Sequence, residues 1–222
     1  MIMIKDLEYS FARTRKARKS GGARLSITTL TIPDGGWLHL TGVNGSGKST
    51  LVKLILGILR PDHGKVLVCG HDAYHNRRIL MQDTGVVWGH RSTLWWDASA
   101  QDALGALNAI YRCKAEGVRE LQRQLISRLE TQDYMSRPIR TLSLGQRQRV
   151  EILACLAHAP TRIFLDEPFV GLDTKGVECV RSTLEEFFPH ATLVIIDHDS
   201  NALTRCERID MADITSKTAT QD

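Results

Sequence analysis

The sequence predicts an α/β domain with a mostly parallel central sheet. Two segments, TRIFLDEP at 161–168 and ATLVIIDHD at 191–199, are continuous apolar runs that end in acidic residues. Such runs are typical of central parallel strands, which are buried on both faces. A helical pattern at 174–188 separates the two runs. Strands that alternate with helices along a chain indicate an α/β sheet.

The preceding segments extend this pattern. Short strands, marked by β-branched or alternating residues, are predicted at 3–11, 25–32, 37–43, 65–70 and 84–89. A helix is predicted at 49–59, and its mostly apolar register indicates that it is largely buried. The stretch 98–158 has helical patterns at 98–113 and 118–130 without a strand signal, which predicts a helical insert between two strands of the sheet.

Composition excludes several classes of protein. The 222 residues are 42% hydrophobic and 24% charged, as in an ordinary soluble protein. The longest apolar stretches stop far short of the roughly 18 residues that a membrane-spanning helix needs, and the N-terminus lacks a signal-peptide pattern. Five scattered cysteines without a C-x-x-C pair favour reduced thiols in a cytosolic compartment over disulfides or a zinc site.

The net charge of +4 is unevenly distributed. The first 25 residues hold seven basic and two acidic groups, and the stretch 13–24 is predicted to be a basic loop between two strands. A solvated loop is the simplest interpretation, while contact with anionic lipid or with the edge of a nucleotide stays open. Nucleic-acid binding is not expected, because no aromatic residues interleave with these charges.

A phosphate-binding loop is predicted at 42–49. The segment GVNGSGKS fits the pattern G-x-x-x-x-G-K-[ST] and lies between a predicted strand and a predicted helix. Glycines allow consecutive backbone N–H groups to curl around an anion, and the start of the helix adds its positive end. We expect Lys48 to reach the β- and γ-phosphates and Ser49 to ligate Mg²⁺.

An acidic pair supplies the second anchor for Mg²⁺. Asp166 ends an apolar strand, so its carboxylate is expected at the carboxyl edge of the sheet, where open α/β sheets bind ligands. Glu167 directs a second carboxylate towards the same crevice. One acid can hold the water shell of the metal while the other orients the attacking water.

A second anion-binding arrangement follows about a hundred residues after the first. In TLSLGQRQRVEILACLAHAP at 141–160, Ser143 and Gly145 lie at the start of a predicted helix. Together with GVNGSGKST, IFLDEP, GLD at 171–173 and the histidine of IIDHD, this set closely resembles the ATPase subunit of ABC transporters. The resemblance implies one domain over 1–222, with a P-loop core and small antiparallel β-subdomain at 1–88 and 160–222 and an inserted helical subdomain at 89–159.

The resemblance also implies roles for individual residues around ATP and Mg²⁺. Phe11 would stack on adenine, with Tyr9 as the alternative. Glu167 would be the general base or the water-orienting acid, and His198 the histidine that contacts the γ-phosphate. From the residues alone, a histidine after an apolar strand is more often structural. The metal would be held by Ser49 and Asp166. The triphosphate would be held by Gly42, Asn44, Gly45, Ser46, Gly47, Lys48, Ser49 and Thr50.

Two ATPase subunits are expected to bind two ATP molecules head to tail. In this arrangement Ser143, Gly145 and Gln146 would bind the γ-phosphate held by the second subunit, and Asp173 would lie at the dimer seam. Two positions depart from the pattern of the family. Leu144 replaces the first glycine of the usual LSGGQ, and His90 stands where a glutamine is usual. A histidine is shorter than glutamine and titrates near neutrality, so hydrolysis is expected, at a rate that depends on His90.

The favoured function is an ATPase subunit on the cytoplasmic face of the membrane that drives separate transmembrane permease subunits. A soluble ABC ATPase of translation or DNA repair is the second possibility, but those usually carry two ATPase halves or a long coiled-coil insert. A module that binds nucleotide without hydrolysing it is the third, and it rests on His90 alone.

Three of the four tryptophans lie in GVVWGHRSTLWWD at 85–97. Trp88 is assigned to the core because it ends an apolar strand. Trp95 and Trp96 are adjacent and cannot both face inward, so one ring is expected on the surface. The segment is similar to a loop of exporter ATPases, which favours export. There the loop lines a groove for a short cytoplasmic helix of the membrane subunit, and we expect Trp95 or Trp96 to anchor that helix.

Overall fold

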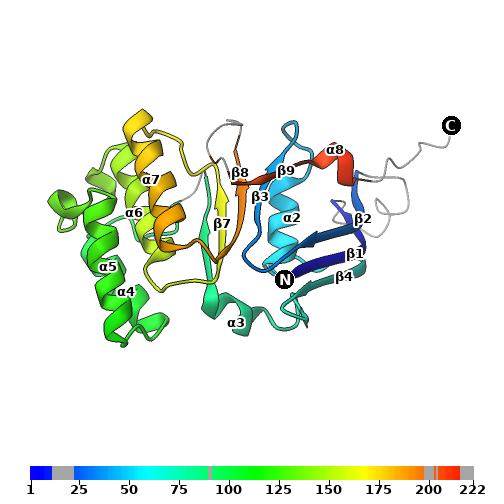
Figure 1. Ribbon diagram of the computed structural model, residues 1–222, viewed down its shortest axis with the longest axis horizontal. Helices are drawn as coiled ribbons and strands as arrows, with labels where there is room; N and C mark the ends of the chain where they lie inside the picture. The colour runs from blue at the N-terminus through cyan, green and yellow to red at the C-terminus, as the bar shows by residue number, and fades with distance from the viewer. Residues whose placement is uncertain (12–22, 90–91, 198–202, 204, 216–222) are drawn as a thin grey trace.

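Two β-sheets lie side by side with one helix between them (Figure 1). The computed structural model describes residues 1–11, 23–89, 92–197, 203 and 205–215. A five-stranded sheet has the order β6-β7-β8-β3-β9, and a four-stranded sheet has the order β2-β1-β4-β5. The described part of the chain contains no helix that is long and apolar enough to cross a membrane.

The five-stranded sheet is parallel throughout, and its strands are β6 (Thr84–Val87), β7 (Arg162–Asp166), β8 (Thr192–Ile196), β3 (Trp37–Thr41) and β9 (Glu207–Asp210). Every residue of β3 and β8 is buried, as expected for central parallel strands. In the register of the sheet, Ile196 lies opposite both Leu40 and Asp166. The carboxyl ends of β3, β7 and β8 therefore meet at one edge. Strand β9 was not predicted, because its sequence ERID carries no strand pattern.

The four-stranded sheet is antiparallel, with strands β1 (Ile2–Ser10), β2 (Arg24–Ile32), β4 (His63–Val68) and the two-residue β5 (His71–Asp72). Its inner face places Ile2, Ile4 and Leu7 in one apolar cluster with Leu51 of helix α2 and Leu40 of β3. Helix α2 is therefore packed between the two sheets, which agrees with the burial that its apolar register predicted.

Helix α2 (Lys48–Ile55) is shorter than the predicted helix at 49–59. The chain leaves the helix through Gly57, which has a φ of 65° and whose added Cβ would lie 2.1 Å from the carbonyl oxygen of Ala73. The N–H of Ile58 donates to the oxygen of Lys53 at 2.8 Å, and the N–H of Gly57 donates to the oxygen of Leu54 at 3.1 Å. This pair of bonds is the Schellman motif, in which a left-handed glycine ends a helix.

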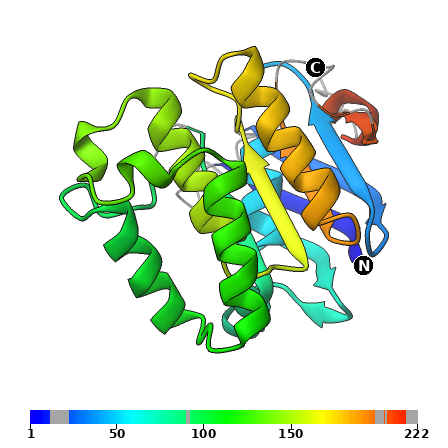
Figure 2. The same ribbon diagram turned by 60° about the vertical axis from the view of Figure 1, so that its left-hand side comes forward.

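The longer helices of the insert and α7 lie on the side of the parallel sheet that faces away from α2 (Figure 1). Figure 2 is turned so that these helices come forward. They are α4 (Ala100–Ile110), α5 (Glu116–Arg128), α6 (Leu144–Leu156) and α7 (Thr174–Phe187). Their apolar faces form a second core cluster, which includes Leu104, Leu125, Ile152 and Val180. Short helical segments complete the described chain at α3 (Arg77–Leu80), η1 (Met81–Asp83), η2 (Gln132–Tyr134), η3 (Ile139–Thr141) and α8 (Met211–Ile214).

Candidate nucleotide-binding site

The loop between β3 and α2 curls around its own lysine. Gly42, Gly45 and Gly47 adopt φ angles of 137°, 82° and 101°, a region that side chains disfavour. The ammonium group of Lys48 donates to the carbonyl oxygens of Gly42 at 2.6 Å and Val43 at 3.1 Å. The predicted phosphate-binding loop therefore has the curled backbone that its glycines suggested.

The inside of this loop fits an anion. Among the described residues, the buried hydroxyl oxygen of Ser46 has no hydrogen-bond partner. An unpaired buried hydroxyl is costly, and an acceptor such as a phosphate oxygen would relieve that cost. A Cβ added at Gly45 would touch nothing within 4 Å, so the loop is open on that side.

The acidic pair lies where the strand register brings it. Asp166 ends β7, and the N–H of Glu167 donates to the carbonyl oxygen of Ile196 at 2.7 Å, which holds the pair to the end of β8. Glu167 has a φ of 52°, the left-handed conformation that costs a non-glycine residue roughly 1–2 kcal/mol. Strain of this kind gathers at functional sites, where the surrounding structure enforces it.

The loop and the acidic pair share one hollow of about 400 Å³. Residues from the end of β1, the phosphate loop, β7 and β8 contribute to it. Its lining consists of Phe11, Asn44, Gly45, Gly47, Lys48, Ser49, Thr50, Asp166, Glu167 and Ile196. All of these except Ile196 were expected from the sequence, since the apolar strand position of Ile196 gave no signal of a ligand contact. Gly42 and Ser46 belong to the same loop but do not line the hollow.

The structure separates the two candidate adenine contacts. Phe11 lines the hollow and is 43% exposed. Tyr9 lines a different hollow with Arg24 and Asp62, and its ring meets that of Phe11 edge-on at 5.6 Å between centroids. Phe11 is therefore placed to contact a nucleotide in this hollow, and Tyr9 supports it from the side.

The signature residues form a second hollow of about 660 Å³ at the start of α6. Ser143 caps this helix, and its side chain and that of Gln146 bond to each other's backbone N–H groups. Gly145 lies so close to the next loop that an added Cβ would be 2.6 Å from the oxygen of Gly171. Asp173, in the same hollow, caps α7 through a 2.8 Å bond from the N–H of Gly176. The two hollows have no lining residue in common.

Ion pairs that the sequence did not signal border the second hollow. Glu130 accepts from Lys175 at 2.6 Å and from Arg149 at 2.7 Å. These bonds, that of Lys175 first, hold the pKa of the Glu130 carboxyl below its ordinary value. The three residues are far apart in sequence, so no local pattern could have paired them.

The two histidines assigned to catalysis, His90 and His198, lie outside the described residues, as does most of the predicted basic loop. Their roles stay predictions. Gly89 lies against the acidic pair, since a Cβ added there would be 2.8 Å from the Cβ of Glu167. The ring nitrogen Nε2 of the buried His39 is 3.1 Å from the carbonyl oxygen of Asp197. His39 was not expected from the sequence, because nothing distinguishes it within an apolar strand.

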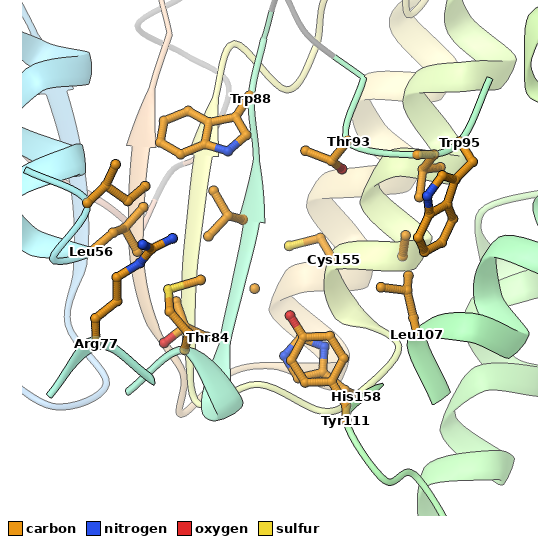
Figure 3. A pocket seen from close by; sticks show the side chains of 16 residues that line it. Leu56, Arg77, Thr84, Trp88, Thr93, Trp95, Leu107, Tyr111, Cys155 and His158 are labelled. Atoms are coloured by element: carbon orange, nitrogen blue, oxygen red, sulfur yellow. The ribbon is translucent and has the colours of Figure 1, made fainter. Parts of the chain in front are cut away.

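A groove of about 250 Å³ lies between the core sheet and the helical insert (Figure 3). Trp88, Leu56 and Arg77 line one side, while Trp95 and Leu107 line the other. Trp88 is half-buried against the core, as predicted, but part of its ring also faces the groove.

The adjacent pair of tryptophans is exposed on both rings. Trp95 is 52% and Trp96 is 50% exposed. Trp95 lines the groove. The ring of Trp96 lies under the guanidinium of Arg147, whose Cζ is 5.1 Å from the ring centroid. The two rings therefore have different surroundings, and only Trp95 belongs to the groove.

The floor of the groove carries a stacked pair, His158 and Tyr111, whose ring centroids are 3.8 Å apart. Burial lowers the pKa of His158 to about 4, although the backbone of Thr84 and the charge of Asp83 favour the protonated ring. The imidazole is therefore neutral at ordinary pH and serves as an aromatic wall.

Comparison with known proteins agrees with this geometry. A family model described as ABC transporter matches residues 25–170. An ABC transporter ATP-binding protein of Pyrococcus furiosus is 30% identical over 186 residues, which is 83% of this chain and 69% of the relative. The sulfate/thiosulfate import ATP-binding protein CysA of Synechocystis is 34% identical over 177 residues, which is 79% of this chain and 49% of CysA.

Solved structures confirm the predicted fold class. The ATP-binding cassette MJ0796, in a dimeric post-hydrolysis state bound to ADP and Pi, has a TM-score of 0.78 and 24% identity. The match covers 95% of this chain and 94% of that one. This likeness concerns the fold, a P-loop core with an inserted helical region.

Replacing Phe11 by alanine should weaken ATP binding by about 1–3 kcal/mol, the range that lost base–aromatic stacking shows. The ring lines the hollow of the phosphate loop, so its loss removes the stacking surface without touching the loop. Nucleotide titration of the Phe11→Ala and Tyr9→Ala proteins checks this. A loss of affinity confined to Tyr9→Ala would mean that adenine is bound elsewhere.

The free energy of unfolding should fall as pH decreases from 6.5 towards 4 in a way that His158→Phe abolishes. Between pH 6.5 and 4 the histidine is protonated in the unfolded chain but stays neutral in the folded chain, so acid favours unfolding. The contribution of His158 to the free energy of unfolding is fully present above pH 6.5. Within the window, the free energy of unfolding falls by up to about 1.4 kcal/mol per pH unit. Denaturant unfolding of both proteins across this range measures it. Parallel pH curves would show that the ring titrates normally in the folded chain.

Proposed function

Because the chain belongs to the ABC transporter family as one of its ATP-hydrolysing subunits, we propose that it works as a head-to-tail dimer that powers a separate membrane permease, in the direction of export. One observation carries the dimer proposal. The hollow of the phosphate loop and the hollow of the signature residues have no lining residue in common, so within one chain they are two separate sites.

A second copy in the opposite orientation would supply what each site lacks. The start of α6, with Ser143, Gly145 and Gln146, would face the γ-phosphate held by the partner's phosphate loop. A capped helix start offers backbone N–H groups and a positive end to an anion. Asp173, at the start of α7 in the same hollow, would lie at the seam between the two copies.

Each residue of the first hollow has a task that suits its chemistry. Backbone N–H groups of the glycine loop and Lys48 would hold the triphosphate, and Phe11 would stack on the base. Ser49 and Asp166 would hold Mg²⁺, which neutralises phosphate charge when bound. Glu167 would orient the attacking water and accept its proton as the bond to phosphorus forms. We assign the contact to the γ-phosphate to His198 and the contact to the water to His90.

The groove is proposed to receive a short cytoplasmic helix of the permease, which would hold the subunit at the cytoplasmic face of the membrane. Trp95 is the favoured anchor, because it is half-exposed and lines the groove while Trp96 does not. Large aromatic side chains beside an apolar groove suit helix recognition. The segment 89–94 would pass the position of that helix to the nucleotide.

Export is favoured by the similarity of the segment WGHRSTLWWD to the loop of exporter ATPases. Import is the second candidate, because a relative named for sulfate and thiosulfate import is 34% identical. Transport into inside-out vesicles that contain the subunit and its permease separates the two. Uptake driven by external ATP supports export, whereas ATP-driven loss of preloaded substrate supports import.

The variant Glu167→Gln should bind ATP as the wild type does and hydrolyse it about 10²–10⁴-fold more slowly, because a positioned base contributes that much. The amide keeps the size of the side chain but cannot accept the proton. Single-turnover hydrolysis and ATP-dependent dimerisation measure the two properties. Glu178→Gln, an exposed carboxylate of α7, is the matched control. Turnover at the wild-type rate in Glu167→Gln would remove Glu167 from this role.

The variant Trp95→Ala should keep the ATPase activity of the isolated subunit and lose about 2 kcal/mol or more in binding to the permease, as expected for an aromatic hot spot. Trp96→Ala serves as the comparison, since its ring packs under Arg147 outside the groove. Co-purification and binding of the detergent-solubilised permease measure the effect. If both variants assemble with the permease and transport normally, neither tryptophan anchors the permease helix.

A further inference from the structure

A buried carboxylate on α6 holds the loop that connects the nucleotide site with the groove. Glu151 is only 5% exposed. Its Oε1 accepts from the hydroxyl of Ser92 and, at 3.1 Å, from the N–H of Thr93. Its Oε2 accepts from the hydroxyl of Thr93 at 2.8 Å. Three donors from two consecutive residues therefore satisfy one buried charge, which is the condition for keeping such a charge inside a protein.

The loop held in this way has functional neighbours on both sides. Three residues before Ser92, Gly89 packs against the backbone of Asp166 and the side chain of Glu167. Immediately after, Thr93 and Trp95 line the groove together with Leu94. Glu151 therefore fixes a short link, residues 92–95, that begins three residues after Gly89 and leads into the groove.

Helix α6, which carries Glu151, also contacts other functional parts of the molecule. Its first turn presents the signature residues, and Glu151 follows about two turns later. One turn further, Cys155 lines the groove. On the turn before Glu151, the amide of Gln148 donates to the carbonyl oxygen of Pro168 at 2.9 Å, just beyond the acidic pair. The same helix thus touches the signature hollow, the acidic segment, the link and the groove.

We propose that Glu151 is a positioning residue that locks the link at 92–95 to the signature helix, so that the two move as one body. This rests on the proposed function, because it assigns the lock a task in the ATPase dimer. When the groove is filled or emptied, the lock carries the displacement to the signature residues as well as to the acidic pair. The signature residues then close on ATP at the same time as Glu167 aligns the attacking water.

The lock is best tested from the loop side, since Ser92 and Thr93 are exposed and their replacement leaves the core intact. The double variant Ser92→Ala/Thr93→Val removes both hydroxyl donors. Its kcat should fall about 10- to 100-fold, the loss that a misplaced catalytic geometry causes, while KM and nucleotide affinity stay unchanged. Steady-state ATPase assays and nucleotide titration of the full chain measure these quantities.

Two further variants distinguish the lock from mere stability. Glu151→Gln replaces one of the two accepting carboxylate oxygens by an NH₂ group. Combining it with the loop variant should reduce kcat little further, because both changes break the same contact. Thr183→Val removes a fully buried hydroxyl that bonds to the oxygen of Cys179 at 2.7 Å, so it should lower the unfolding midpoint and leave kcat unchanged. In the Glu167→Gln background, the loop variant should also weaken ATP-dependent dimerisation.

The outcomes separate the two proposals. A wild-type chain without ATPase activity under any condition would overturn the proposed function itself. If the wild type hydrolyses ATP and the loop variant has the same kcat, Glu151 is not a positioning residue. The positioning role is equally overturned if Thr183→Val loses as much kcat as the loop variant, or if the losses of Glu151→Gln and the loop variant simply multiply.

Discussion

The register of the parallel sheet is the constraint on which the rest of this structure depends. Leu40, Ile196 and Asp166 lie opposite one another, so the phosphate loop, the end of β8 and the acidic pair leave the sheet at the same edge. A slip of one residue in strands buried on both faces would exchange the side chains that are close-packed in the two cores, so the packing opposes it. The apolar runs of β3 and β8 therefore determine the geometry of the site although they contribute almost none of its chemistry.

The molecule has two apolar clusters, and the groove lies where they meet. One cluster joins the antiparallel sheet and α2 to one face of the parallel sheet. The other joins the helical insert and α7 to its opposite face. Polar contacts of Glu151 and Gln148 tie helix α6 to the segments that follow β6 and β7.

The sequence was most informative where chemistry and spacing are local. The phosphate loop, the acidic pair and the signature turn each occupy a few consecutive residues, and the structure brings the first two into one hollow. It was least informative where residues meet across long separations. Glu151 with Thr93, and Glu130 with Lys175, are pairs that only the folded chain creates. Which hollow Phe11 and Tyr9 each line is also visible only in the folded chain, because residues two apart in a strand share a face and the sequence pattern does not distinguish them.

The left-handed backbone of Glu167 has a consequence for the evolution of this chain. At this φ the residue that folds most easily is glycine, so a glutamate here lowers stability by roughly 1–2 kcal/mol. Selection for thermal stability alone, with no demand for turnover, would therefore favour loss of the carboxylate. A copy of the chain that is selected for folding but not for turnover should keep the buried strands after this position has changed.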